Sequence, residues 1–261
     1  DNEKKYDGCV LLGDVCDVSQ GVVEASDRVS KRLFAKYPRE EIPVGTGIFV
    51  LNEEELNRVN PSEKEKKYVR KYIDGNDLSR YKIEFSNHYL IYSNKECREK
   101  IEKGEYSNLK KHLDRMQDYI TSSNAPYGIH RPRKEIYFEN PKIIVPSMFA
   151  VNNFALDIYE HYYVGMSFSC VIQKDTNYEL EYILAILNSR FAYEWFYNNG
   201  KLRGAGVDIG VDKLRTVPIR IAKKNKQLEI GEMVRQLETG YNKELDDKLN
   251  QLIEELYERR I

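Results

Sequence analysis

The sequence lacks the closely spaced cysteines and histidines that metal centres and disulfide frameworks require. Its four cysteines form no C-x-x-C pair, and its four histidines are dispersed without ligand spacing. Zinc sites and disulfide-rich secreted domains both depend on such spacing. The sequence therefore argues against a metal site and against disulfides. It predicts a cytoplasmic protein with four reduced thiols, at Cys9, Cys16, Cys97 and Cys170.

Long apolar runs are also missing. No stretch approaches the ~20 apolar residues that a membrane-spanning helix needs, and no signal peptide opens the chain. We therefore expect no membrane partner. The first residue is Asp1 rather than Met, so we expect the chain to begin inside a longer protein. With 261 residues, 41% of them hydrophobic and 32% charged, the chain is long enough to bury a core.

Short strands and amphipathic helices follow one another irregularly along the chain. Apolar alternation at residues 164–172 is typical of a half-buried strand. Other strands are expected at residues 47–51, 88–93 and 141–147, and in an extended segment at 11–23 that turns at Ser19, Gln20 and Gly21. Helical spacing predicts helices beginning near Ser62 and at residues 105–120, 178–200 and from 228 onward.

This mixture predicts an α+β fold with two parts. A strand-rich domain with packed helices is expected over residues 1–222, followed by a C-terminal helix or helical hairpin over residues 223–261.

Two short motifs resemble those of DNA methyltransferases but lack the residues that the chemistry needs. The Gly-x-Gly within E-I-P-V-G-T-G-I-F-V-L (residues 41–51) has no acid before it and leads into a strand rather than a helix. N-A-P-Y (residues 124–127) has Ala125 where the catalytic motif needs a rigid proline. We expect a tight turn at each place. No D…(D/E)-x-K cluster lies on strands either, so a divergent methyltransferase or nuclease is kept only as an alternative.

Charge is unevenly distributed although the net charge is only −1. Residues 189–226 contain nine basic and three acidic side chains, a local charge of +6, whereas residues 227–261 contain five basic and nine acidic ones, a local charge of −4. Phosphates bind where such positive charge gathers. Lys201 and Arg203 lie among glycines, which predicts either a backbone that approaches a sugar–phosphate chain closely or a mobile, solvated loop.

A second group of basic and aromatic residues lies in the run Y-G-I-H-R-P-R-K (residues 127–134). Guanidinium groups bind guanine edges and phosphates alike. The alternative is that Arg131 or Arg133 pairs with Glu135 or Glu139 on a strand edge.

Taken together, these segments resemble the TaqI-like C-terminal specificity domain. That domain is the target-recognition part of adenine-specific DNA methyltransferases and of fused restriction–modification enzymes. The resemblance runs from about residue 11 to residue 219 and is carried by LGDVCDVSQGVV, GIFVLNEEE, RKYIDGNDLSRY, YLIYSN, HRPRKEIYFENPKIIVPSMFAVNNFALD, YILAILNSRFAYEWF and VDKLRTVPI. The portion LNS…G…LRTVPI is also similar to target-recognition domains of type I specificity subunits.

The resemblance implies a chain that binds double-stranded DNA without bond chemistry of its own. A catalytic methyltransferase domain or subunit, absent from this chain, would use S-adenosylmethionine, with Mg²⁺ if it also cleaves DNA. The expected DNA contacts are Tyr127, His130, Arg131, Arg133 and Lys134 in the first loop, Lys201, Arg203 and Lys213 in the second, and Ser19 and Gln20 as weaker base contacts.

The C-terminal segment allows two interpretations. Residues 227–261 are similar to the helix of type I subunits that packs against a partner helix or the methyltransferase, which predicts a helix-mediated protein contact. The alternative is a hairpin folded on its own domain. A protein-interaction module of a phage-defence complex, which would use this acidic helix instead of the basic loops, is a further alternative function.

Overall fold

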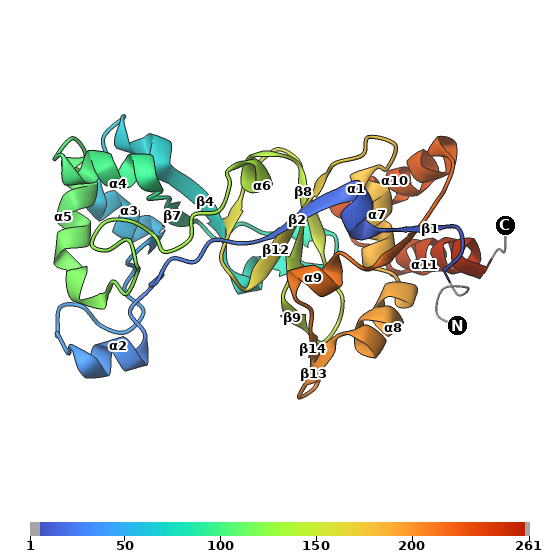
Figure 1. Ribbon diagram of the computed structural model, residues 1–261, viewed down its shortest axis with the longest axis horizontal. Helices are drawn as coiled ribbons and strands as arrows, with labels where there is room; N and C mark the ends of the chain where they lie inside the picture. The colour runs from blue at the N-terminus through green and yellow to red at the C-terminus, as the bar shows by residue number, and fades with distance from the viewer. Residues whose placement is uncertain (1–5, 259–261) are drawn as a thin grey trace.

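A four-stranded sheet lies near the middle of the molecule and separates two lobes (Figure 1). In the computed structural model, which describes residues 6–258, the strand order is β10-β8-β12-β2 and each neighbouring pair is antiparallel. The strands are β2 (Cys16–Gln20), β8 (Lys142–Pro146), β10 (Ala155–Asp157) and β12 (Phe168–Gln173). The predicted α+β class is confirmed.

Both faces of this sheet are covered. Along β8, Ile143 packs into one hydrophobic cluster and Ile144 into the other, and on β12 Val171 and Cys170 divide in the same way. Successive side chains of a strand point to opposite faces, so a sheet between two cores is apolar on both. A strand does lie here, but the prediction that residues 164–172 form a half-buried strand is wrong, because Val171 is as deeply buried as Cys170.

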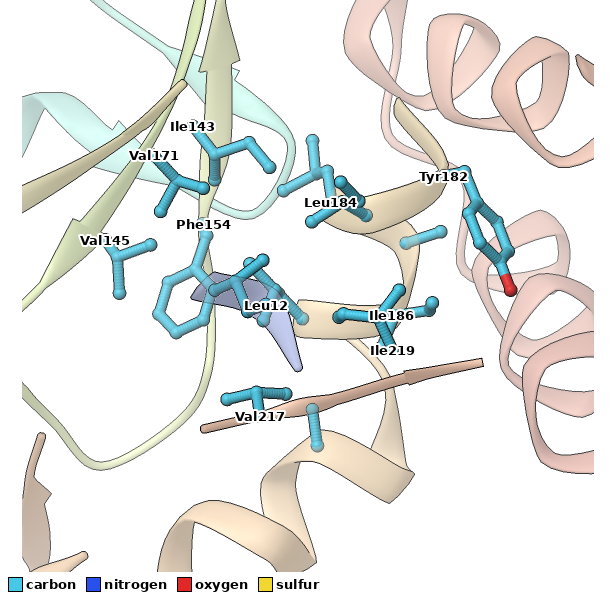
Figure 2. Packing of buried hydrophobic residues seen from close by; sticks show 14 of the residues in the cluster. Leu12, Ile143, Val145, Phe154, Val171, Tyr182, Leu184, Ile186, Val217 and Ile219 are labelled. Carbon is cyan, nitrogen blue, oxygen red and sulfur yellow. The ribbon is translucent and has the colours of Figure 1, made fainter. Parts of the chain in front are cut away.

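The first cluster builds what we call the helix lobe. Its centre is α7 (Leu180–Leu187), which is apolar nearly all round because other helices surround it. Figure 2 shows Leu184 and Ile186 of this helix beside Leu12, Phe154 and Val217. The helices of the lobe are α1 (Leu12–Val15), α8 (Arg190–Asn199), α9 (Val211–Leu214), α10 (Lys224–Thr239) and α11 (Lys243–Glu258).

Two small sheets complete the helix lobe. β1 (Cys9–Leu11) pairs with β15 (Pro218–Arg220), which brings two segments far apart in the sequence side by side. The other sheet has the order β13-β14-β9, and its strands are β13 (Lys201–Arg203), β14 (Gly206–Asp208) and β9 (Met148–Phe149).

The second cluster builds what we call the tyrosine lobe, around a sheet of order β11-β4-β7-β3. Its strands are β3 (Val50–Asn52), β4 (Val69–Ile73), β7 (His88–Ile91) and β11 (Tyr163–Val164), and β11 runs parallel to β4. Short hairpin strands β5 (Leu78–Ser79) and β6 (Lys82–Ile83) follow β4.

Helices cover the tyrosine lobe on its outer side. They are α2 (Lys31–Lys36), α3 (Glu53–Val59), α4 (Lys95–Glu102) and α5 (Ser107–Arg115), with 3₁₀ turns η1 (Glu65–Tyr68), η2 (Gly75–Asp77) and η3 (Gln117–Tyr119). The short helix α6 (Ile136–Glu139) lies near the middle of the molecule, beside β12 (Figure 1). Each of α2, α3 and α4 begins with a side-chain cap, from Ser30, Asn52 and Asn94 respectively.

The chain crosses from the helix lobe to the tyrosine lobe through residues 21–24, and this crossing is tightly packed. Gly21 donates its N–H to the carbonyl of Phe168 (2.9 Å). A Cβ on Gly21 would lie 2.1 Å from the carbonyl oxygen of Gly165, so no other residue fits there without displacing backbone. The two lobes are therefore joined by direct backbone packing, not by a loose linker.

Two predicted helices are wrong. The helix expected near Ser62 is replaced by η1 and strand β4, because β4 fills the place between β11 and β7. The helix expected at residues 178–200 is two helices. Asn188 exchanges hydrogen bonds with the backbone of Phe154 (2.8 and 3.0 Å), and Ser189 caps α8, so the chain turns between them.

Other expectations are confirmed. The Gly-x-Gly segment and N-A-P-Y both form turns, and residues 142–146 form β8. The cysteines are free. The C-terminal segment forms two helices that pack on the helix lobe through Ile230, Val234 and Leu249. The boundary at residue 222 stays a prediction.

Candidate nucleic-acid interface

The loop at residues 127–134 is fixed at the crossing between the lobes. Arg131 and Val23 exchange two backbone hydrogen bonds of 2.9 Å, and the N–H of His130 donates to the carbonyl of Glu24 (3.2 Å). The loop thus adds a short bridge beside the segment that leaves β2. A fixed backbone holds its side chains in one orientation before a ligand arrives.

Arg133 is held in a strained backbone conformation by its own side chain. Its φ of 58° lies in the left-handed region, which non-glycine residues rarely adopt. Its Nε donates to the carbonyl of Gly21 (3.1 Å) and its Nη2 to Oε1 of Gln20 (3.1 Å). Partial burial, with a contribution from the neighbouring Arg131 charge, lowers the pKa of Arg133. Arg133 therefore fastens the loop to the end of β2.

Arg131 and Lys134 are exposed, and neither side chain enters a hydrogen bond or ion pair with any residue that the structure describes. The alternative in which Arg131 or Arg133 pairs with Glu135 or Glu139 is wrong. Both acids face Arg70, whose Nη1 lies 2.6 Å from Oε1 of Glu139. The guanidinium of Arg131 is consequently available to a ligand.

Tyr127 lies away from this surface, against α5. Its hydroxyl donates to Oδ1 of Asp114 (2.6 Å), and the ammonium of Lys110 lies 5.5 Å from the centre of its ring. Lys110 first, and then the Tyr127 hydroxyl, lower the pKa of Asp114. His130 accepts the N–H of Ser123 at Nδ1 (3.1 Å), which leaves Nε2 as the nitrogen that carries the proton.

Ser19 and Gln20 lie in strand β2 and not in a turn, which corrects the expectation for residues 19–21. Gln20 donates from Nε2 to the carbonyl of Met166 (2.9 Å) while its Oε1 accepts from Arg133. Gln20 is thus occupied on both sides of its amide and acts as a brace for Arg133. The Ser19 hydroxyl donates to the carbonyl of Gln20 (3.0 Å) and remains partly exposed.

The glycine-rich segment forms a hairpin whose residues 201–205 are exposed to solvent, and the alternative of a mobile loop stays a prediction. β13 and β14 pair in register from Lys201–Asp208 to Arg203–Gly206, and the hairpin projects from the lower margin of the molecule in Figure 1. The Tyr197 hydroxyl braces it by donating to the carbonyls of Ala150 (2.6 Å) and Ala205 (3.2 Å). The cations of this hairpin, Lys201 and Arg203, therefore lie on paired strands.

The three cations Lys201, Arg203 and Lys213 differ in their partners. Arg203 forms an ion pair with Asp208 (3.5 Å), whereas the side chains of Lys201 and Lys213 are exposed and form no ion pair within the described part of the chain. Lys213 lies on α9, close to β2. Arg215, the residue that ends this helix, donates from Nη2 to the carbonyl of Val18 (2.8 Å). Its place beside β2 depends on this long-range bond, which the basic composition of the segment does not predict.

The structure thus places Arg131 and Arg133 beside the chain that leaves β2, where Arg133 bonds to Gly21 and Gln20, whereas the Ser19 side chain points to the opposite face of the strand from Gln20. It places Lys213 on the neighbouring α9, and it places Lys201 and Arg203 on the projecting hairpin. Tyr127 is not part of this surface. A further basic segment at residues 28–39, with five basic and no acidic residues, was missed although its charge run is visible in the sequence.

Within residues 6–258 the structure places no three or more His, Cys, Asp or Glu side chains where they could hold a metal ion. In the same part of the chain no helix is both long enough and apolar enough to span a membrane.

Comparison with known proteins gives a family and a fold. The model of the TaqI-like C-terminal specificity domain matches residues 70–219, which is more than half of the 261 residues. The structure of the type IIL restriction–modification enzyme MmeI in complex with DNA aligns with a TM-score of 0.62 at 11% identity, over 92% of this chain and 32% of that one. The type IIG restriction endonuclease BpuSI aligns with a TM-score of 0.54 at 13% identity, over 98% and 32%.

A type I restriction–modification complex aligns with a TM-score of 0.43, which is too low to support an inference. The comparison with curated proteins gave no match. The chain spans about a third of the length of MmeI and of BpuSI, and at these identities the likeness shows the fold alone.

Proposed function

This chain belongs to the family of TaqI-like C-terminal specificity domains, and from that premise we propose that it is the DNA target-recognition part of a restriction–modification enzyme. The observation that carries the proposal is the guanidinium of Arg131, exposed and without an ion pair among the described residues, on a backbone bridged to Val23 at the lobe crossing. A guanidinium binds O6 and N7 of guanine through two parallel hydrogen bonds, which requires a fixed approach.

The roles of the neighbouring residues follow from their partners. Arg133 is a positioning residue, because its Nε and Nη2 are taken by Gly21 and Gln20. His130 offers Nε2–H and Lys134 a free ammonium to the same duplex. Tyr127 contacts DNA only if its bond to Asp114 is exchanged. Base contact by Ser19 is favoured over base contact by Gln20, whose amide is already engaged.

Phosphate contact is assigned to Lys201 and Arg203 on the hairpin and to Lys213 on α9. Cations on a projecting hairpin approach a sugar–phosphate chain from outside the grooves, where contacts position the protein without distinguishing sequence. Lys201 stands opposite Asp208 across the hairpin, but Asp208 pairs with Arg203, and Lys201 forms no ion pair among the residues described.

The longer enzyme is proposed to carry the catalysis, in the cytoplasm. A methyltransferase domain or subunit would transfer a methyl group from S-adenosylmethionine to adenine N6, with Mg²⁺ if the enzyme also cleaves. The specificity domain would hold the duplex while the adenine leaves the stack. The likeness to MmeI, a type IIL restriction–modification enzyme, and to BpuSI, a type IIG restriction endonuclease, supports this context. Helices α10 and α11 are proposed to contact that catalytic part.

Selection of preferred sites from a random duplex pool, followed by titration of single variants, tests the proposal. Arg131→Ala should lose ~1–3 kcal/mol at the preferred site and little on random duplex, because only the former offers the guanine edge. Arg131→Lys should recover little, since an ammonium lacks the fork. Equal losses on preferred and random duplex would remove base contact by Arg131. Failure of the wild-type chain to enrich any sequence would remove the proposed function.

A further inference from the structure

We propose that α2 carries a second phosphate-binding surface, formed by Lys31, Arg32 and Lys36 and called here the α2 cation face. It lies on the tyrosine lobe, apart from both basic groups that the sequence indicated. Its ligand is the backbone of the duplex that the proposed function assigns to this chain, so the inference rests on that function.

The helix is divided into a cationic side and an apolar side. At 100° per residue, Lys31, Arg32 and Lys36 fall within an arc of about 140°, and Leu33 and Phe34 fall outside it. Leu33 and Phe34 pack against the core of the tyrosine lobe, whereas all three cations are exposed. The apolar side anchors the helix and the cationic side faces solvent.

The charge on this face is not compensated. None of the three cations forms an ion pair with any residue that the structure describes, whereas Arg28 pairs with Asp74 (3.1 Å) and Arg39 with Asp118 (2.6 Å) on either side of the helix. Helix α5 shows the usual arrangement, with Lys110 and Asp114 paired at 2.8 Å. An uncompensated cluster of cations raises the local concentration of anionic ligands.

The centre of the face is open to close approach. Ala35 falls between Lys31 and Arg32 around the helix and is exposed, so only a methyl group stands between the cations. The Ser30 side chain accepts the N–H of Leu33 (3.1 Å) and fixes where the helix begins. Three cations on a capped helix can therefore contact consecutive phosphates of one strand.

The position of α2 in the molecule favours duplex DNA over a small anion. Figure 1 shows α2 at the lower margin of the tyrosine lobe and the β13–β14 hairpin at the lower margin of the helix lobe. The lobe crossing and its loop lie between them. A duplex that contacts Arg131 can extend to a cationic element on either side, and a rigid polyanion is the ligand that such an arrangement fits.

The test is a titration of preferred and random duplexes at several salt concentrations with the triple variant Lys31→Ala, Arg32→Ala, Lys36→Ala. Each lost phosphate contact flattens the slope of log K against log salt by about 0.9, so we expect a decrease of about 2–3 and a loss of roughly 10- to 100-fold near physiological salt. The loss should be equal for both duplexes, since phosphates carry no sequence information.

A matched variant controls for net charge. Lys64, Lys103 and Lys111 are exposed on the same lobe and form no ion pair within residues 6–258, so their triple alanine variant removes the same charge elsewhere. It should change affinity less than about 3-fold. The charge-preserving variant Lys31→Arg, Arg32→Lys, Lys36→Arg should retain the wild-type slope. Single Lys36→Ala, expected to flatten the slope by about 0.9, replaces the triple variant if that one does not fold.

Two outcomes would overturn the inference, and they are distinguishable. If the wild-type chain selects a sequence but the triple variant keeps its salt slope, α2 is not a phosphate surface and the proposed function stands. If the wild-type chain binds no duplex at any salt concentration, the proposed function fails and the inference fails with it.

Discussion

The two lobes differ in the side chains that fill their cores, although they share one sheet. The helix lobe has a mainly aliphatic core in which α7 is enclosed by α8, α10 and α11. The core of the tyrosine lobe includes Tyr68, Tyr72, Tyr92, Tyr106, Tyr119, Tyr162 and Tyr163. Aliphatic side chains pack regular helices, whereas a buried tyrosine also brings a hydroxyl that must find a partner.

Two of those hydroxyls stabilise irregular backbone. Tyr119 donates to the carbonyl of Tyr37 (2.6 Å), and Tyr92 donates to the carbonyls of Pro132 (3.0 Å) and Arg133 (3.2 Å). The two bonds of the Tyr92 hydroxyl lie under the loop that displays Arg131. The lobes therefore show a division of labour, in which Tyr92 of the tyrosine lobe holds the loop that carries Arg131 and Tyr197 of the helix lobe holds the β13–β14 hairpin.

The shared sheet provides the largest expected effect. Ile143→Ala and Ile144→Ala remove adjacent, fully buried side chains that face the helix lobe and the tyrosine lobe respectively. Each should lower the free energy of unfolding by about 2–5 kcal/mol. Since one sheet serves both cores, calorimetry should show a single transition that moves by a similar amount in both variants.

Exposed Met148, 60% accessible on β9, gives the control for this pair, and Met148→Ala should change stability by no more than about 0.5 kcal/mol. Two separate transitions, with Ile144→Ala moving only one of them, would show that the lobes unfold independently.

A buried acid at the crossing provides the next largest effect. Burial raises the pKa of Glu24 from its ordinary value of 4.5 to about 7, and the hydrogen bond from the Tyr72 hydroxyl (2.9 Å) opposes the shift only in part. Between these pH values the folded chain binds more protons than the unfolded chain. The contribution of Glu24 to stability should therefore fall by about 3 kcal/mol as pH rises from 4.5 to 7 and change little above that.

Glu24→Gln should remove this part of the pH dependence, measured by denaturant unfolding across the range. Glu238 on α10 is the matched acid in the helix lobe, because burial and the charge of Glu181 raise its pKa to about 7 as well. If Glu238→Gln alone abolished the pH dependence of stability, that dependence would arise in the helix lobe and not at the crossing.

The hydroxyl of Tyr92 gives the smallest effect on stability and the sharpest test of the division of labour. Tyr92→Phe should cost roughly 1 kcal/mol of stability, since two carbonyls lose a donor while the ring still packs. Discrimination between preferred and random duplex should fall, because the loop under Arg131 loosens. Tyr182→Phe, which removes the bond to the Arg220 carbonyl (2.7 Å) in the helix lobe, should cost similar stability and leave discrimination unchanged.

The sequence predicts the parts of this molecule that depend on local pattern. β8 follows from its apolar run, the turns follow from glycine and proline, and the position of the loop at residues 127–134 follows from its basic residues and Pro132. The strand β4 was mistaken for a helix because its partners β11 and β7 come from distant segments. Pairing across the sheet overrides local periodicity in such places.

The candidate site shows the same limit. Arg133 and Gln20 are 113 residues apart, and the sequence around either residue does not predict the hydrogen bond between their side chains. The distinction between Arg131 as a free guanidinium and Arg133 as a brace therefore required the fold. The α2 cation face, by contrast, lies within a run of five basic residues without an acid at residues 28–39, which the sequence shows directly. Only the structure shows that Arg28 and Arg39 of this run are paired with acids, which leaves the three cations of α2 without ion pairs among the described residues.

The central claim is that the loop at the lobe crossing contacts bases, whereas the β13–β14 hairpin and α9 contact phosphates. Its most direct test compares Arg131→Ala with Lys201→Ala on the preferred site and on random duplex at two salt concentrations. Arg131→Ala should lower discrimination by ~1–3 kcal/mol and leave most of the salt slope. Lys201→Ala should weaken both duplexes equally and flatten the slope by about 0.9. Equal, salt-dependent losses for both variants would contradict the claim.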